Sequence, residues 1–90
     1  TEKFGIISQM QRSAVSVPSN IAEGRLRSAE KSSTPFLLIA LASCAELQTQ
    51  VIISEQIGYI KASESEKLQL EIDEIMKMIN SLVRKLKANG

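Results

Sequence analysis

The sequence lacks histidine and tryptophan, and it holds a single cysteine, Cys44. One cysteine cannot form an intramolecular disulfide, and Cys44 lies in an apolar run, where a free cysteine usually behaves as a small buried hydrophobe. Imidazole is the commonest metal ligand and general base, so its absence argues against a zinc site and against nucleophilic hydrolases. No glycine-rich phosphate-binding loop occurs. We therefore expect no metal, no cofactor and no enzymatic activity.

Aromatic residues, net charge and long apolar runs are also scarce. With aromatics at 3% of the chain, recognition of bases by stacking on side-chain rings is disfavoured. The net charge of +1 leaves no chain-wide basic field, so nucleic-acid binding would need a local patch. The longest apolar run, residues 35–42, is too short to span a bilayer, and no signal peptide is visible. We expect a cytoplasmic protein without a membrane segment.

Apolar residues are plentiful, and they recur at steps of three and four. This spacing places them on one face of a helix, so we expect an all-α domain over residues 1–90. Pro18 lies inside the first pattern and predicts a kink, because proline removes a backbone donor. We favour one kinked helix over two shorter helices broken near Val17. The predicted helices cover about residues 3–23, 33–57 and 64–87.

Residues with capping preferences mark the predicted helix ends. Gly24 and Gly58 would end the first and second helices as glycine C-caps. Ser33-Thr34-Pro35 would start the second helix, with a hydroxyl cap and a proline in the first turn. Ser63 and Glu66 would form a capping box at the start of the third. The short connections that remain favour antiparallel neighbours.

The second predicted helix is apolar on more than one face. Its two stripes are Leu37, Ala40, Cys44, Leu47 and Val51, and beside them Leu38, Leu41, Ala45 and Ile52. Such a helix must be buried on more than one side. Three helices could close a three-helix bundle, whereas the second stripe favours a missing fourth element or a contact with another subunit.

Polar residues also follow a helical spacing beside the apolar stripes. They are Gln9, Arg12, Ser16, Asn20 and Glu23 in the first helix, and Ser43, Glu46 and Gln50 in the second. One interpretation is that both sets face water. The other is a partly buried polar seam that fixes helix register, in which Arg12 pairs with Glu46 or Glu23 while Asn20 and Gln50 bond across. An acid–base pair of Glu23 and Glu46 is the weakest alternative, because no further catalytic marker accompanies it.

Two groups of cations stand out. Arg25, Arg27 and Lys31 cluster at the first connection, which is either a solvated loop or, together with Arg12, a site for backbone phosphates of nucleic acid. The terminal Arg84, Lys85 and Lys87 are explained by complementation of the helix dipole.

Residues 9–24, QMQRSAVSVPSNIAEG, resemble the signature of the four-helix-bundle family encoded in intervening sequences of bacterial 23S ribosomal RNA genes. A proline inside a helix followed by SNIAEG is distinctive. The similarity continues through Arg27, Phe36-Leu37, Glu46-Leu47 and Gly58-Tyr59. This family is also similar to the accessory protein of diversity-generating retroelements.

The resemblance implies an antiparallel up-and-down four-helix bundle, of which this chain carries three helices and lacks the first. It also implies a homo-oligomer, with a pentamer as the expected form, and no enzymatic activity. Binding of RNA, or of a nucleic-acid-processing protein, follows from the similarity to the retroelement protein. The family's paired arginines are reduced here to Gln11-Arg12, which weakens the case for nucleic acid.

These observations together predict a non-enzymatic, oligomeric helical bundle that serves as a binding scaffold for nucleic acid or a nucleoprotein partner. A protein–protein adaptor that binds no nucleic acid is the alternative.

Overall fold

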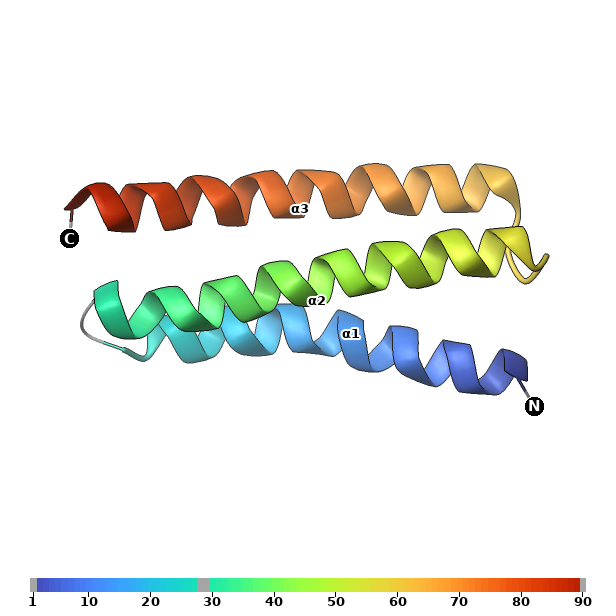
Figure 1. The fold of residues 1–90 in the computed structure, drawn as a ribbon, viewed down its shortest axis with the longest axis horizontal. Coiled ribbons are helices and arrows are strands. Elements are labelled where there is room, and N and C mark those ends of the chain that lie inside the picture. Colours follow the sequence, from blue (N-terminus) through green and yellow to red (C-terminus); the bar gives the residue numbers. More distant parts are fainter. Residues whose placement is uncertain (1, 28–29, 90) are drawn as a thin grey trace.

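The computed structural model describes residues 2–27 and 30–89, and the side chains of residues 30–32 and 89 lie outside that description. Its described part consists of three α-helices without a strand: α1 (Glu2–Arg25), α2 (Glu30–Gln56) and α3 (Ala62–Asn89). Successive helices run antiparallel (Figure 1). The all-α class and the three predicted helices are therefore confirmed.

The helix α1 is continuous through Pro18, which settles the choice in favour of one helix rather than two. The predicted C-cap at Gly24 is wrong, because α1 extends to Arg25 and Gly24 is buried within it. A Cβ atom at Gly24 would lie 3.3 Å from the carbonyl oxygen of Ser33 and 3.5 Å from Cβ of Phe36. Glycine fits this position because the end of α1 and the first turns of α2 leave little room for a side chain.

The predicted start of α2 is also wrong. The helix begins at Glu30, so Pro35 lies inside it rather than in its first turn. The hydroxyl of Ser33 does not cap α2 but donates a hydrogen bond to the carbonyl of Gly24, at 3.0 Å. The side chain that was expected to start one helix thus gives a second hydrogen bond to a carbonyl at the end of the preceding one, which also accepts from the backbone amide of Arg27, at 3.2 Å.

The connection between α2 and α3 was predicted better. Gly58 adopts a positive φ of 82°, as expected of a glycine C-cap. The amides of Gly58 and Tyr59 donate to the carbonyls of Glu55 and Ser54, which is the Schellman pattern. The predicted box of Ser63 and Glu66 is displaced by two residues, since Glu64 accepts instead from the backbone amide of Lys61, at 3.0 Å.

The three helices form a layer rather than a closed bundle. α2 packs against both α1 and α3, and over the described residues no Cα atom of α1 lies within 8 Å of one in α3. The layer measures 45 × 23 × 12 Å between Cα atoms, and Figure 1 shows α2 in the middle. The alternative of a closed three-helix bundle is therefore excluded, and the arrangement agrees with the predicted bundle that lacks one helix.

The core lies along α2 and is continuous from one flanking helix to the other. Its buried apolar residues are Val17, Leu37, Ala40, Cys44, Val51, Ile72, Ile79 and Val83. Burial raises the pKa of the Cys44 thiol. This environment agrees with the expectation that Cys44 serves as a small hydrophobe.

An apolar groove remains between α1 and α3. Val17, Pro18 and Ile21 line it on one side, and Ile75, Met78 and Leu82 on the other. A fourth helix of an up-and-down bundle would occupy this position, so the layer has the form of such a bundle with one helix missing.

Most of α2 is apolar. The segment Ser33–Gln56 is long and apolar enough to cross a membrane by length and composition alone. The central helix of a bundle meets the same criterion, and α2 has that position here.

Candidate interaction surfaces

Short polar side chains form a hydrogen-bonded chain across the contact between α1 and α2. Ser43 donates to the carbonyl of Ile39, at 3.0 Å, so its hydroxyl is left to accept from Ser16, at 2.8 Å. Asn20 in turn donates to Oγ and to the carbonyl of Ser16, at 3.0 and 2.8 Å. The structure thus brings Ser16, Asn20 and Ser43 together at the helix contact, where Ser43 is buried.

A second cluster surrounds Glu46. Its Oε1 accepts hydrogen bonds from the Ser13 hydroxyl and from Nε2 of Gln50, both at 3.3 Å. Ser13 and Gln50 are buried, whereas Glu46 is exposed. The other polar atom of the Gln50 side chain, Oε1, is buried and has no hydrogen-bond partner. Ser13 was missed by the sequence analysis, since it lies between the predicted apolar and polar stripes.

The pairings predicted for this seam are wrong. Asn20 and Gln50 bond to residues four positions earlier on their own helices rather than across the contact. Such i,i+4 partners are already adjacent on a helix, so they are reached without any tertiary constraint. Arg12 is exposed and forms no ion pair with any described residue. Glu23 pairs instead with Arg27, one turn away, at 3.6 Å.

Arg12 and Glu46 nonetheless line the same polar depression between α1 and α2. Its remaining residues are Gln9, Ser13, Ser16 and Ser43. Both charged side chains are exposed, and the carboxylate and the guanidinium are more than 4 Å apart. The depression therefore offers one charge of each sign to a partner.

Glu23 and Glu46 do not form a catalytic pair in this fold. Glu46 lies opposite Ser13, and Glu23 is ten residues further along α1. At 1.5 Å per residue, the two carboxylates are displaced by about 15 Å along the helix axis. Paired catalytic carboxylates lie within about 10 Å of each other. Within the described part of the chain, no three Cys, Asp or Glu side chains gather where they could hold a metal ion.

Basic side chains from the ends of two helices meet at one end of the layer. Arg25 and Arg27 line a depression there together with Leu82 and Leu86 of α3. The guanidinium of Arg27 also stacks over the ring of Phe36, at 4.9 Å. The depression places the last turns of α3 beside the end of α1. We call the cations of these turns the basic end: Arg25, Arg27, Arg84, Lys85 and Lys87.

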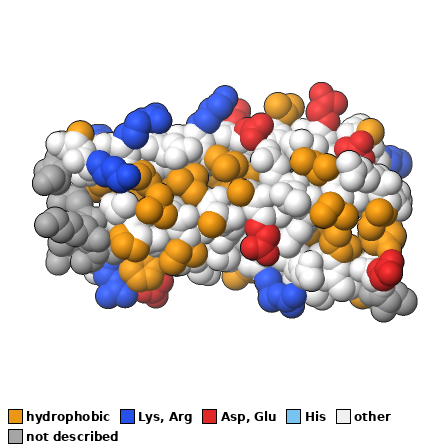
Figure 2. Space-filling model, viewed as in Figure 1, with side chains coloured by type: hydrophobic (Ala, Val, Ile, Leu, Met, Phe, Trp, Pro, Cys, Tyr) orange, Lys and Arg blue, Asp and Glu red, His pale blue; other side chains and the backbone are white. Residues whose placement is uncertain are grey.

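The sequence analysis missed this juxtaposition, because Arg25 and Lys85 are far apart in the chain. Lys31, the third member of the predicted loop cluster, has its side chain outside the described residues, and Arg12 lies away from the basic end on the middle of α1. In Figure 2, most blue side chains lie toward the end of the layer where the chain terminates and most red ones toward the other, although each end also shows the opposite colour.

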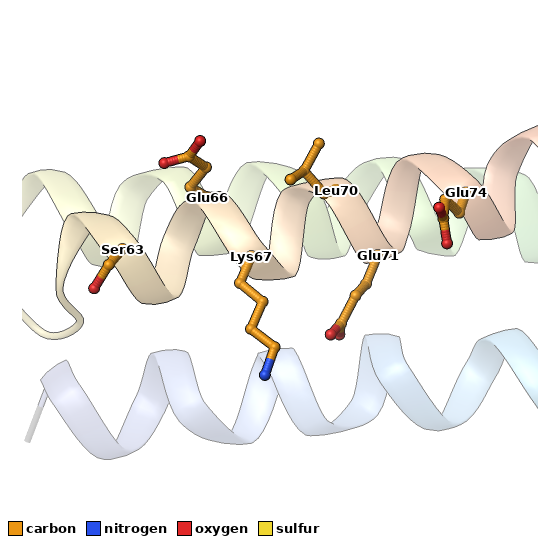
Figure 3. A pocket seen from close by; sticks show the side chains of 6 residues that line it. All are labelled: Ser63, Glu66, Lys67, Leu70, Glu71 and Glu74. Atoms are coloured by element: carbon orange, nitrogen blue, oxygen red, sulfur yellow. The ribbon is translucent and has the colours of Figure 1, made fainter.

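Acidic residues dominate the opposite end. A shallow depression along the first turns of α3 is lined by Glu66, Glu71 and Glu74 around Lys67. In Figure 3, Lys67 and Glu71 extend to the side on which α1 lies, whereas Glu66 extends away from it. The charge of the molecule is therefore separated along its long axis.

The model of the 23S rRNA-intervening sequence protein family matches residues 1–81. The chain belongs to this family. The sequence signature in residues 9–24 therefore identified the family correctly. No curated protein matches the chain.

Among solved structures, the chain is similar to a crystal structure from Bacteroides thetaiotaomicron, described as a protein of unknown function from the S23 ribosomal protein family. The TM-score is 0.84 at 24% sequence identity, and the match covers 87% of this chain and 72% of the other. At this identity the likeness establishes a shared fold.

In this member of the 23S rRNA-intervening sequence protein family, the distinctive signature coincides with the α1 side of the seam. Ser13 and Ser16 lie within it and bond to Glu46 and Ser43 of α2, and Asn20, also within it, donates to Ser16 on its own helix. Gly24 ends the signature at a position where an added Cβ would lie 3.3 Å from the carbonyl oxygen of Ser33. The signature residues thus position α1 on α2.

Proposed function

We propose that this protein is a non-catalytic, self-associating helical scaffold that binds the phosphate backbone of nucleic acid through its basic end. The observation that carries the proposal is that Arg25 at the end of α1, and Arg27 just after it, lie beside the last turns of α3. Although the net charge is only +1, cations outnumber carboxylates at this end, because the acidic residues of α3 lie in its first half, at the far end. Backbone binding needs such a patch and no base-stacking aromatics.

Dipole complementation accounts for part of this arrangement but not for all of it. Cations in the last turns of α1 and α3 are favoured there by the helix dipoles. The N-terminus of α2, whose dipole is positive, lies at the same end. Arg27 is the most constrained of the cations, since Glu23 and the ring of Phe36 hold its guanidinium.

Self-association is supported by the outer face of α2. Leu38 and Ile39 are exposed by 46% and 48%, and Ile52 and Ile53 by 37% and 41%. Contiguous exposed apolar surface on a soluble protein usually marks an interaction site. A protomer that covers this face would also hide the most membrane-like segment of the chain, which agrees with a cytoplasmic protein that has no membrane partner. The pentamer implied by the family resemblance remains a prediction.

A mobility-shift titration with single- and double-stranded RNA tests nucleic-acid binding. The variant Arg25→Gln/Lys85→Gln removes two cations from the basic end. A matched control, Lys61→Gln/Lys67→Gln, removes two exposed cations from the opposite end. We expect the first variant to bind more weakly and to lower the salt slope by roughly 1 to 2, because each phosphate contact contributes about 0.7 to 0.9. No binding at low salt, or an equal loss in both variants, would contradict the phosphate-contact proposal.

A protein–protein adaptor without nucleic-acid binding is the second candidate. The uncharged outer face of α2 favours it, since Glu46 is the single charged residue between Ser33 and Ser54. Under this alternative the protein self-associates, as measured by light scattering, but does not shift nucleic acid at any salt concentration.

A further inference from the structure

We infer that the basic end binds a single strand, and that the base of an unpaired nucleotide stacks on the guanidinium of Arg27 while Arg25 binds a neighbouring phosphate. This inference rests on the proposed binding of nucleic acid and names its substrate class. Two features carry it: the way in which Arg27 is held, and the apolar lining of the depression that both arginines share.

The side chain of Arg27 is held by two neighbours. Its guanidinium carbon, Cζ, lies over the ring of Phe36, 4.9 Å from the ring centre, and its Nη2 lies 3.6 Å from Oε2 of Glu23. The backbone amide of Arg27 donates to the carbonyl of Gly24, at 3.2 Å, which fixes the residue just after α1. The side chain is nevertheless 47% exposed. The planar group therefore rests on Phe36 and still offers accessible surface to a ligand.

The two arginines differ in their charge environment. Glu23 lies beside Arg27, so part of the charge of that guanidinium is already compensated. No described carboxylate lies within 4 Å of Arg25. A compensated guanidinium is a weaker ligand for phosphate but keeps its flat surface, and such surfaces stack on the bases of single-stranded RNA. This difference assigns the phosphate to Arg25 and the base to Arg27.

The depression beside the arginines has room for a base. Apolar side chains from all three helices line it: Ile21, Leu37, Leu82 and Leu86. Its volume of about 440 Å³ lies within the range of sites for small organic molecules, about 300 to 1,000 Å³. A base that enters the depression removes apolar surface from water. Only an unpaired nucleotide can place its base there, because the bases of a duplex are stacked and paired inside it.

Charge alone would not produce a preference for the single strand. Double-stranded nucleic acid carries about one phosphate per 1.7 Å of its axis, which is a denser array than that of one strand. A patch that only neutralised phosphates would therefore bind a duplex at least as tightly as a single strand. Tighter binding of the single strand thus reports contact with bases.

Mobility-shift titrations of the full chain with three probes of equal length test the inference. The probes are a single-stranded RNA, the same RNA as a duplex, and a strand of abasic nucleotides, which keeps the phosphates without the bases. We expect the single strand to bind about tenfold more tightly than either of the other two, because one stacked base contributes that much.

The variant Arg27→Lys keeps the positive charge and removes the planar surface. We expect it to bind the single strand about five- to tenfold more weakly at every salt concentration, with an unchanged salt slope. Its affinity for the duplex and for the abasic strand should change by less than about twofold, because the phosphate contacts remain.

Two further variants separate stacking from charge. Phe36→Leu keeps every charge but removes the ring on which the guanidinium of Arg27 rests, so we expect a loss of affinity for the single strand alone. Arg12→Lys makes the same exchange in the middle of α1, away from the basic end, and should bind all three probes as the unmodified protein does. Circular dichroism checks that each variant is folded, and if Arg27→Lys or Phe36→Leu is unfolded, the other decides.

The outcomes distinguish this inference from the proposed function. Equal binding of single strand and duplex by the unmodified protein would overturn the stacking inference and leave phosphate binding in place. The same conclusion would follow if the folded variants at Arg27 and Phe36 kept the preference for the single strand, or lost affinity equally for all three probes. No shift of any probe at low salt would instead refute the proposed binding of nucleic acid itself.

Discussion

The hydroxyls of Ser16 and Ser43 lie 2.8 Å apart where α1 crosses α2, and the direction of this hydrogen bond is fixed. The Ser43 hydroxyl has one proton and donates it to the carbonyl of Ile39, so Ser16 is the donor of the bond between the two hydroxyls. Asn20 completes the chain by donating to Ser16. Ser43 is buried, and its hydroxyl is the group on α2 that accepts the hydrogen bond from Ser16 of α1.

Replacement of Ser43 by alanine should destabilise the protein. The change removes the acceptor of the Ser16 hydroxyl and leaves that donor at the helix contact, so we expect the free energy of unfolding to fall by about 1 to 2 kcal/mol. Urea denaturation followed by circular dichroism measures it. Ser19→Ala, at an exposed position on α1, is the control and should change stability by less than about 0.5 kcal/mol. Equal effects of the two variants would contradict the proposed role of the seam.

Gly5 and Gly24 should respond differently to alanine, although both lie inside α1. Nothing lies within 4 Å of a Cβ at Gly5, so Gly5→Ala should stabilise the protein by up to about 1 kcal/mol through helix propensity. At Gly24 the same gain is offset by the close carbonyl of Ser33, and Gly24→Leu should cost about 1 to 3 kcal/mol by overpacking. Thermal or urea unfolding of the three variants distinguishes these effects. A stabilised Gly24→Leu variant would show that the helix ends are not closely packed.

Cys44 should make stability fall at alkaline pH. Burial raises the pKa of its thiol above the ordinary value of 9.0. The unfolded chain therefore loses this proton first, and the stabilisation present below pH 9 declines as the pH rises through the folded-state pKa. Urea midpoints between pH 7 and about pH 10, compared with those of Cys44→Ala, isolate the contribution of the thiol from that of lysines and Tyr59. Parallel curves for the two proteins would disprove it.

The sequence predicted the number and kind of elements because the signal is local. Apolar spacing along each segment depends on the helix repeat alone, so α1, α2 and α3 were found together with the C-cap at Gly58. Helix starts were misplaced by two or three residues, since Ser33 and Glu64 have partners that spacing does not identify. Gly24 illustrates the same point, because a glycine needed for close packing and a glycine that caps a helix look alike in one sequence.

The candidate surfaces were predicted less completely, and for a geometric reason. Arg12 was expected to pair within its own chain, but helix periodicity gives the face of a residue and not its distance from a residue on another helix. The meeting of Arg25 with the end of α3 depends on how two antiparallel connections fold back. The sequence shows these cations as separate groups, and the arrangement of the layer turns them into one patch.

Because the backbones of α1 and α3 each pack against α2 and not against each other over the described residues, close backbone packing joins only helices that are neighbours along the chain. Such a topology has low contact order, so the search for the native state needs no long loop to close and should finish in microseconds to milliseconds. Either helical hairpin can serve as the nucleus, with the remaining helix adding afterwards. For the same reason, a force that pulls α1 away from α2 leaves the packing of α2 against α3 intact.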